Sequence, residues 1–133
     1  MIVVDTSALM AIVLDEPQAG DCSAVLAREA DVAISAANLA EALIVAERRG
    51  CAEQMAAIIF LLGFEVVPVT EASARGVAAA YARWGKGAHP AGLNFGDCFA
   101  YELARERGCP LLFVGADFAG TDVGSALTAP PKR

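Results

Sequence analysis

Short apolar runs alternate along the chain with longer segments in which apolar residues recur every three or four positions. The short runs predict buried β-strands, and the longer segments predict amphipathic α-helices. Strands are expected at Ile2–Val4, Val32–Ile34, Phe64–Val69 and Leu111–Val114.

Helices are expected between these strands, and capping or turn residues mark several of their ends. Asp5-Thr6-Ser7 can cap a helix that begins near Ala8. Pro17 suits the first position of a second helix that runs to about Glu29. Further helices are expected over Asn38–Arg49, from there to Leu62, from Thr70 to Arg83 or Trp84, and over Asn94–Arg107. Residues Pro130 to Arg133 are expected to fray.

Strands separated by helices favour right-handed crossovers and a parallel sheet covered on both faces, which is an α/β fold. The 133 residues suit one domain, and no internal repeat or linker divides them. In open parallel sheets, ligands collect at the carboxyl ends of the strands. Asp5 and Asp117 follow the first and fourth predicted strands, so both are expected at that edge.

The net charge of −6 argues against a protein that coats nucleic acid, because such binding needs many Lys and Arg contacts to phosphate. An acidic protein can still act on a phosphodiester if clustered carboxylates hold divalent cations, which reverse the local charge.

The cysteines, the start of the chain and the apolar runs predict the compartment. The four cysteines have no zinc-type spacing, so free thiols in a reducing cytoplasm are expected. Met1 to Asp5 lacks the basic start of a signal peptide, and no uncharged apolar run approaches the roughly 20 residues of a membrane span. We expect a cytoplasmic protein without a membrane segment.

Four carboxylates stand in unusual surroundings: Asp5 after a strand, Glu41 inside an apolar helical run, Asp97 before Cys98, and Asp117 after the last strand. Converging carboxylates repel one another, and burying them unpaired is costly. Mg²⁺ or Mn²⁺ between them would remove the repulsion, because these ions prefer oxygen ligands.

Each acid also has a simpler explanation. Asp5 could be only a helix N-cap, and Asp97 could pair with Asn94 in a related capping arrangement. Glu41 could pair with an arginine, and Asp117 could be an ordinary turn residue. The residues taken singly leave both readings open.

The joint pattern resembles the four acidic blocks of PIN-domain ribonucleases in order and spacing. The blocks are Asp5-Thr6-Ser7-Ala8-Leu9, Glu41 in an early helix, Gly96-Asp97-Cys98-Phe99-Ala100, and Leu111 to Phe118. The segment from Trp84 to Cys98, and Phe118 with Thr121-Asp122-Val123, are similar to a subgroup of VapC toxins. The resemblance covers essentially the whole chain. It implies a single PIN domain over residues 1–133, with a central parallel sheet of four to five strands and helices on both faces.

The same resemblance implies a metal-dependent endoribonuclease that is the toxin of a two-gene toxin–antitoxin system. Asp5, Glu41 and Asp97 carry over as catalytic ligands of Mg²⁺ or Mn²⁺. Asp117 matches the fourth position, and Asp122 lies close enough in sequence to replace or support it. The ions would polarise the scissile phosphate and activate a water for in-line attack, leaving a 3′-hydroxyl and a 5′-phosphate. Thr6 and Ser7 could orient that water, although helix capping explains them equally well.

The cationic residues and the single histidine are weaker candidates. Lys86, in the glycine-rich loop from Gly85 to Gly92, is the preferred RNA phosphate contact, with Arg48, Arg49 and Arg83 behind it. Solvated surface charge is the simpler reading of any one of them. His89 lies beside a proline in the same loop, which favours a structural role over that of a general base.

The helix end from Ile58 to Leu62 is more apolar than one amphipathic stripe requires. Core burial explains most of it, and an exposed remainder would suit a homodimer or a VapB-type antitoxin helix, as the VapC resemblance implies. The alternatives are a PIN nuclease that processes RNA without an antitoxin, and a non-catalytic PIN domain that binds a metal or a partner.

Overall fold

The computed structural model describes residues 1–127, so the predicted fraying of Pro130 to Arg133 lies outside the described residues. Four strands form one sheet in the order β3-β2-β1-β4, and each neighbouring pair is parallel. The strands are β1 (Ile2–Val4), β2 (Val32–Ser35), β3 (Glu65–Val67) and β4 (Leu111–Leu112). Leu111 also forms a parallel bridge to Ser125, which continues the sheet beyond β4. The predicted central parallel sheet is confirmed.

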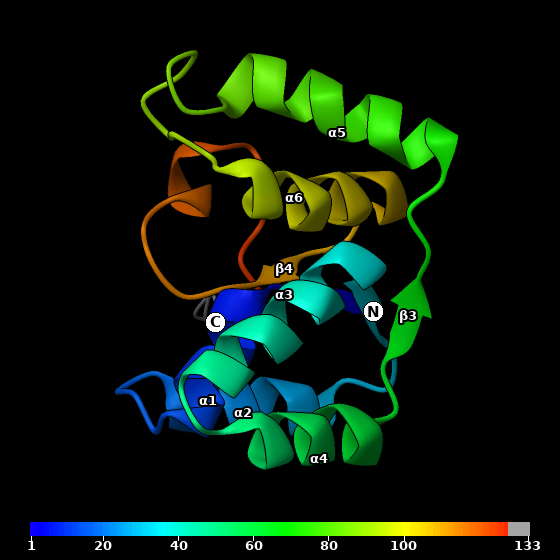
Figure 1. Ribbon diagram of the computed structural model, residues 1–133. Coiled ribbons are helices and arrows are strands. Elements are labelled where there is room, and N and C mark those ends of the chain that lie inside the picture. Colours follow the sequence, from blue (N-terminus) through cyan, green and yellow to red (C-terminus); the bar gives the residue numbers. More distant parts are fainter. Residues whose placement is uncertain (128–133) are drawn as a thin grey trace, which may run out of the picture.

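Helices connect the strands and cover both faces of the sheet (Figure 1). They are α1 (Thr6–Val13), α2 (Ala19–Arg28), α3 (Ala36–Arg48), α4 (Ala52–Leu62), α5 (Glu71–Trp84) and α6 (Phe95–Arg107), followed by a short 3₁₀ helix, η1 (Phe118–Gly120).

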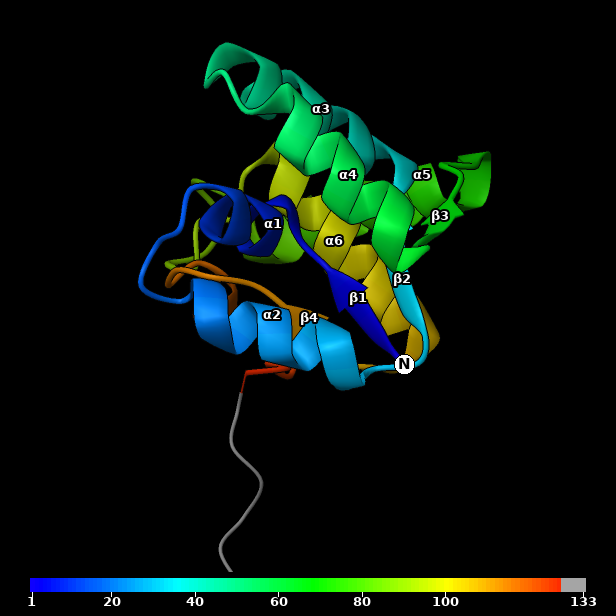
Figure 2. The same cartoon turned by 90° about the horizontal axis from the view of Figure 1, so that it is seen from below.

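Neighbouring strand residues point to opposite faces of the sheet, which gives the protein two cores. Ile2 and Val4 of β1 pack in the core formed with α1, α2, α3 and α4. Val3 packs in the other core, formed with α5 and α6. Figure 1 shows the two layers on either side of the sheet, and Figure 2 looks onto the side that holds α1, α2 and α4. The prediction of helices on both faces is confirmed.

Several predicted element ends were wrong. Pro17 does not begin α2 but lies in the turn before it, because the amide of Ala19 bonds to the carbonyl of Glu16 and Gln18 is the N-cap. The strand predicted to reach Val69 ends at Val67, since Pro68 has no amide hydrogen to donate to a ladder. The last strand ends at Leu112, and the amide of Val114 turns to the hydroxyl of Ser7 instead.

The four cysteines are free thiols, as the sequence predicted. Cys22, Cys51 and Cys98 are buried free thiols, and Cys109 is a half-buried one. Between residues 1 and 127, none of the helices combines the length and the apolar character needed to cross a bilayer.

Candidate active site

Asp5 joins the end of β1 to the start of α1 at the carboxyl edge of the sheet. Its Oδ2 accepts a hydrogen bond of 3.0 Å from the amide of Ser7, so Asp5 is the N-cap of α1 and the helix begins at Thr6. Its own amide donates to the carbonyl of Leu112 at 2.9 Å, which fixes Asp5 beside the end of β4. Only 4% of Asp5 is exposed.

Glu41 comes from the second turn of α3 and reaches toward α1. Its Oε1 accepts hydrogen bonds from Oγ1 of Thr6 at 2.7 Å and from Nδ2 of Asn38 at 3.3 Å. Its Oε2 lies against Gly96, where a Cβ atom on that residue would stand only 2.6 Å away. Glycine at position 96 therefore leaves the space that the Glu41 carboxylate occupies.

Asp97 lies in the first turn of α6. Its Oδ2 accepts from the amide of Asn94 at 3.0 Å, and its amide donates to Oδ1 of Asn94 at 2.8 Å. This reciprocal capping box confirms the predicted capping arrangement.

The three carboxylates share one feature that allows a role beyond helix capping. Each uses a single oxygen, Oδ2 of Asp5, Oε1 of Glu41 and Oδ2 of Asp97, for hydrogen bonds within the fold. Within residues 1–127, no donor bonds to the second oxygen of any of the three. Capping therefore leaves one oxygen of each acid available as a ligand.

Neighbouring acidic charges raise the pKa values of Asp5 and Asp97. Burial raises the pKa of Asp5 from 3.8 to about 6, hydrogen bonds from Ser7 lower it, and the charges of Asp97 and Glu41 raise it further. Burial also raises the pKa of Asp97, the bond from Asn94 opposes this, and the charges of Asp117 and Glu41 add to the increase. Four acids from four segments thus share one electrostatic environment.

The chemistry of this donor set suits Mg²⁺ or Mn²⁺, because such ions prefer carboxylate oxygens and their charge offsets the repulsion. As the side chains lie, no three Asp, Glu, His or Cys groups of the described chain are close enough to hold an ion together. Binding one would require the carboxylates to rotate toward a common point, and their unbonded oxygens leave that rotation open.

The two candidates for the fourth acid lie in different surroundings. Asp117 is exposed at the start of η1, and its charge acts on Asp97. Asp122 accepts a hydrogen bond of 2.6 Å from Tyr101 and faces Arg83 at 3.7 Å. Asp122 is therefore engaged with Tyr101 and Arg83, whereas Asp117 is the acid whose charge raises the pKa of Asp97.

The hydroxyls of Thr6 and Ser7 both bind within the protein. Oγ1 of Thr6 donates to Oε1 of Glu41 and lies 3.1 Å from the carbonyl oxygen of Asn38, to which it also donates. Oγ of Ser7 accepts from the amide of Val114 at 3.0 Å, which joins α1 to the segment leading from β4 to Asp117. Both residues position the chain around the acids.

His89 has the structural role that the sequence favoured. Its Nδ1 accepts from the amide of Ala91 at 3.0 Å, and its ring meets the edge of Trp84 at 4.7 Å between centroids. These contacts hold the glycine-rich loop onto the end of α5.

The predicted cationic residues divide into two groups. Lys86, Arg48 and Arg49 are exposed, and none forms an ion pair with an acid of residues 1–127. Arg83 already has partners within the protein, since its guanidinium stacks over Trp84 at 4.4 Å and forms an ion pair with Asp122. The first three are therefore better placed to meet a polyanion.

Sequence reasoning missed Asn38 and Gly96, which surround Glu41. Asn38 is fully buried, and its Nδ2 donates to the carbonyl of Gly96 at 3.0 Å as well as to Glu41. The available signal was a polar residue one helical turn before Glu41 in an otherwise apolar run, and a glycine next to Asp97.

Comparison with known proteins identifies the family of the chain. The PIN domain family model matches residues 2–124. Ribonuclease VapC28 of Mycobacterium tuberculosis is 44% identical over 129 residues, covering 94% of this chain and 97% of its own length. Ribonuclease VapC of Mycolicibacterium smegmatis is 40% identical over 126 residues, covering 92% of this chain and 98% of its own length.

Solved structures share the fold at low sequence identity. The crystal structure of M. tuberculosis VapC20, described as a sarcin-ricin loop cleaving toxin, superposes with a TM-score of 0.75 at 21% identity and covers 92% of this chain and 96% of its own. A toxin–antitoxin complex from Klebsiella pneumoniae gives a TM-score of 0.69 at 19% identity, with 92% of this chain and 93% of its own covered.

Proposed function

The chain belongs to the PIN-domain family and, within it, to the VapC ribonucleases, and on this premise we propose that Asp5, Glu41, Asp97 and Asp117 form its metal-dependent catalytic site. The reaction is hydrolysis of RNA phosphodiesters by the toxin of a toxin–antitoxin system. Mg²⁺ or Mn²⁺ is the cofactor.

One observation carries the assignment of the site: Asp5 precedes α1, Glu41 lies in α3 and Asp97 in α6, and each keeps one carboxylate oxygen free of hydrogen bonds from residues 1–127. The charges of Asp97 and Glu41 raise the pKa of Asp5, and those of Asp117 and Glu41 raise the pKa of Asp97, as is common where acids gather at a functional site. Asp117 completes the set, because its charge acts on Asp97.

The residues of the chain have separable tasks in this reaction. A bound Mg²⁺ supplies a Lewis acid for the scissile phosphate and an activated water as the nucleophile. Asp5 and Asp97 would hold the ion, with Glu41 and Asp117 as further carboxylate ligands. Thr6 holds Glu41 in place, while Ser7 holds the segment that carries Asp117. Lys86, Arg48 and Arg49 bind phosphates of the RNA away from the scissile bond.

The partners follow from the family and from the surface. We assign a VapB-type antitoxin as the inhibitor and a homodimer as the working form, both in the cytoplasm. Support comes from the toxin–antitoxin complex among the fold neighbours and from exposed apolar side chains that a partner would cover. The most exposed of these are Phe60 and Leu61 at the end of α4, with 83% and 77% exposed, and Phe95 at the start of α6, with 73% exposed.

The test uses the purified chain with total cellular RNA, in Mg²⁺ and in excess chelator, and sequences the ends of the products. Cleavage should require the ion and leave a 3′-hydroxyl and a 5′-phosphate. Asp5→Asn and Asp97→Asn, purified identically to control for contaminating nuclease, should be folded and inactive. Full cleavage by either variant would exclude the proposed site.

A further inference from the structure

We propose that Asn38 is a positioning residue that sets the Glu41 carboxylate against the start of α6, and so fixes how closely Glu41 approaches Asp97. This inference rests on the proposed function, since it gives a role to a residue that would act on the metal only through Glu41.

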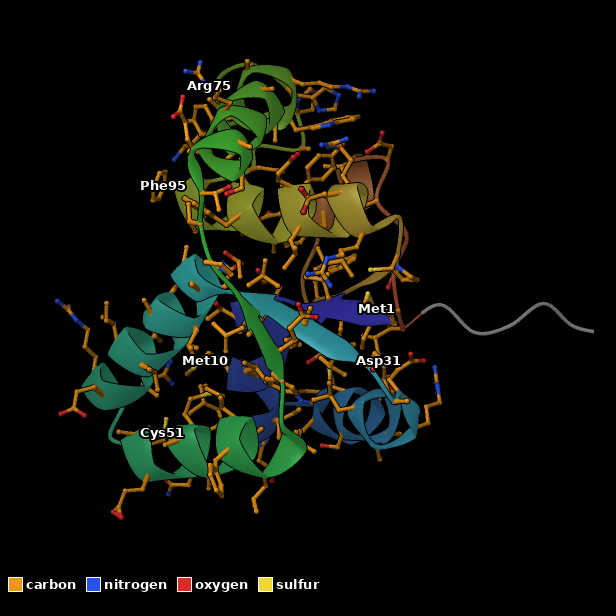
Figure 3. All side chains as sticks on the ribbon, turned by 90° about the vertical axis from the view of Figure 1, so that its right-hand side faces the viewer. Met1, Met10, Asp31, Cys51, Arg75 and Phe95 are labelled. Atoms are coloured by element: carbon orange, nitrogen blue, oxygen red, sulfur yellow. The ribbon has the colours of Figure 1, made fainter. Side chains whose placement is uncertain are left out.

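The amide group of Asn38 spans the site. The side chain is fully buried in the first turn of α3, and its Nδ2 donates to Oε1 of Glu41 at 3.3 Å and to the carbonyl of Gly96 at 3.0 Å. Both hydrogens of one NH₂ group are thus used, one within α3 and one across to α6. The second bond ends one residue before Asp97. Figure 3 shows this end of α6, marked by the outward-pointing Phe95, next to the start of α3.

The orientation of the amide is fixed by its neighbours. If the group were turned over, Oδ1 would face two acceptors, the Glu41 carboxylate and the Gly96 carbonyl, and would be repelled by both. In the observed orientation Oδ1 is buried and has no hydrogen-bond partner within residues 1–127. An unpartnered buried acceptor is costly, and an apolar side chain of similar size would avoid that cost. What the asparagine adds is its two donors.

Those donors decide which oxygen of Glu41 is left free. Asn38 and Thr6 both bond to Oε1, and Oε2 is directed to the space that Gly96 leaves open. Without the amide, Thr6 alone would hold the carboxylate, and the link from α3 to the Gly96 carbonyl would be lost. Glu41 would then sample other rotamers, and the metal would lose a preorganised ligand.

The experiment measures Mn²⁺ binding to the full chain by isothermal titration calorimetry, with folding followed by circular dichroism. Asn38→Ala should bind Mn²⁺ about 10- to 100-fold more weakly than wild type, the range typical of residues that orient metal ligands. Combined with Glu41→Gln, the same substitution should cause little further loss, because Asn38 acts through Glu41. A purely structural role predicts the same loss in both backgrounds and would overturn the proposal.

Two further variants control for loss of stability and for the case in which Asn38→Ala does not fold. Ser35→Ala removes the buried N-cap of the same helix without touching Glu41, so it should lower the melting temperature and leave Mn²⁺ affinity unchanged. Asn38→Leu keeps the approximate size of the side chain, removes its donors and leaves no unpartnered buried acceptor, so it should weaken binding even if Asn38→Ala fails to fold. Wild-type or tighter Mn²⁺ binding by a folded Asn38 variant would refute this proposal alone, whereas a wild-type chain that neither binds Mn²⁺ nor cleaves RNA would refute the proposed function as well.

Discussion

The hydroxyl of Thr6 donates a 2.7 Å hydrogen bond to Oε1 of Glu41, although the two residues lie 35 positions apart and belong to different helices. Thr6 follows Asp5 directly, so this bond links two of the proposed metal ligands through a neutral side chain. Thr6 is also buried, with 7% exposed, which shields the bond from competing water.

Replacement of Thr6 by the isosteric valine should lower the rate of RNA cleavage about 10- to 100-fold, the kinetic equivalent of a lost hydrogen bond to a charged group. The fold should persist, because valine fills the same buried space. Initial rates at saturating Mg²⁺ measure the effect. Thr70→Val is the matched control: it removes the cap of α5, away from the acids, and should cost about 1 kcal/mol of stability without slowing cleavage.

Gly96→Ala should abolish most of the activity while leaving the protein folded. The added Cβ would stand 2.6 Å from Oε2 of Glu41 and force the carboxylate away, and a displacement of about 1 Å at an active site can cost about 100-fold in rate. Gly20→Ala in α2 is the control, because a Cβ there meets no atom within 4 Å. It should raise stability by up to about 1 kcal/mol, as expected for alanine in a helix, with unchanged cleavage. Equal activity of the two variants would contradict the role given to Gly96.

Stability should depend on pH through Asp5. Burial raises the pKa of this carboxyl from 3.8 to about 6, so the folded protein binds its proton more tightly than the unfolded chain does. The free energy of unfolding should therefore fall as the pH rises from about 4 to about 6, by an amount on the order of 3 kcal/mol, and this contribution should level off above that window.

Asp5→Asn removes this titration and supplies the test. In metal-free buffer, the variant should be more stable than wild type at pH 7.5 and show no such gain at pH 4, as measured by urea unfolding. A variant that is less stable than wild type at pH 7.5 would show that capping outweighs burial at this position.

Mutation should distinguish the roles of Asp117 and Asp122 in cleavage and in stability. Asp117→Asn removes an exposed charge near Asp97 and should slow cleavage with little change in melting temperature. Asp122→Asn weakens the contacts with Tyr101 and Arg83 and should cost about 1 kcal/mol of stability while cleavage persists. The opposite pattern would identify Asp122 as the fourth acid.

The order of strands and helices could be predicted from sequence because periodicity and caps are local signals. Helix capping by Asp5 and by the Asn94–Asp97 pair could be named from sequence as one of two explanations, since those bonds join residues two or three positions apart. Element ends were less predictable where a distant partner decided them, as when Ser7 accepts the amide of Val114 across 107 positions.

The candidate acids themselves could be found from sequence, but not the contacts that arrange them. The bonds from Thr6 to Glu41 and from Asn38 to Gly96 form only after α1, α3 and α6 have packed together. From the sequence, Asp117 matched the fourth position and Asp122 stayed open as a replacement or a supporting acid. Tertiary structure separates them, because Tyr101 and Arg83 engage only Asp122.

The most direct test of the metal site is an anomalous difference map from crystals of the full chain soaked in Mn²⁺. We predict a peak between Asp5 and Asp97, about 2.1 Å from a carboxylate oxygen of each, and loss of that peak in Asp97→Asn. A wild-type protein that cleaves RNA in Mn²⁺ but shows its anomalous peak elsewhere, with none near these two acids, would contradict this prediction.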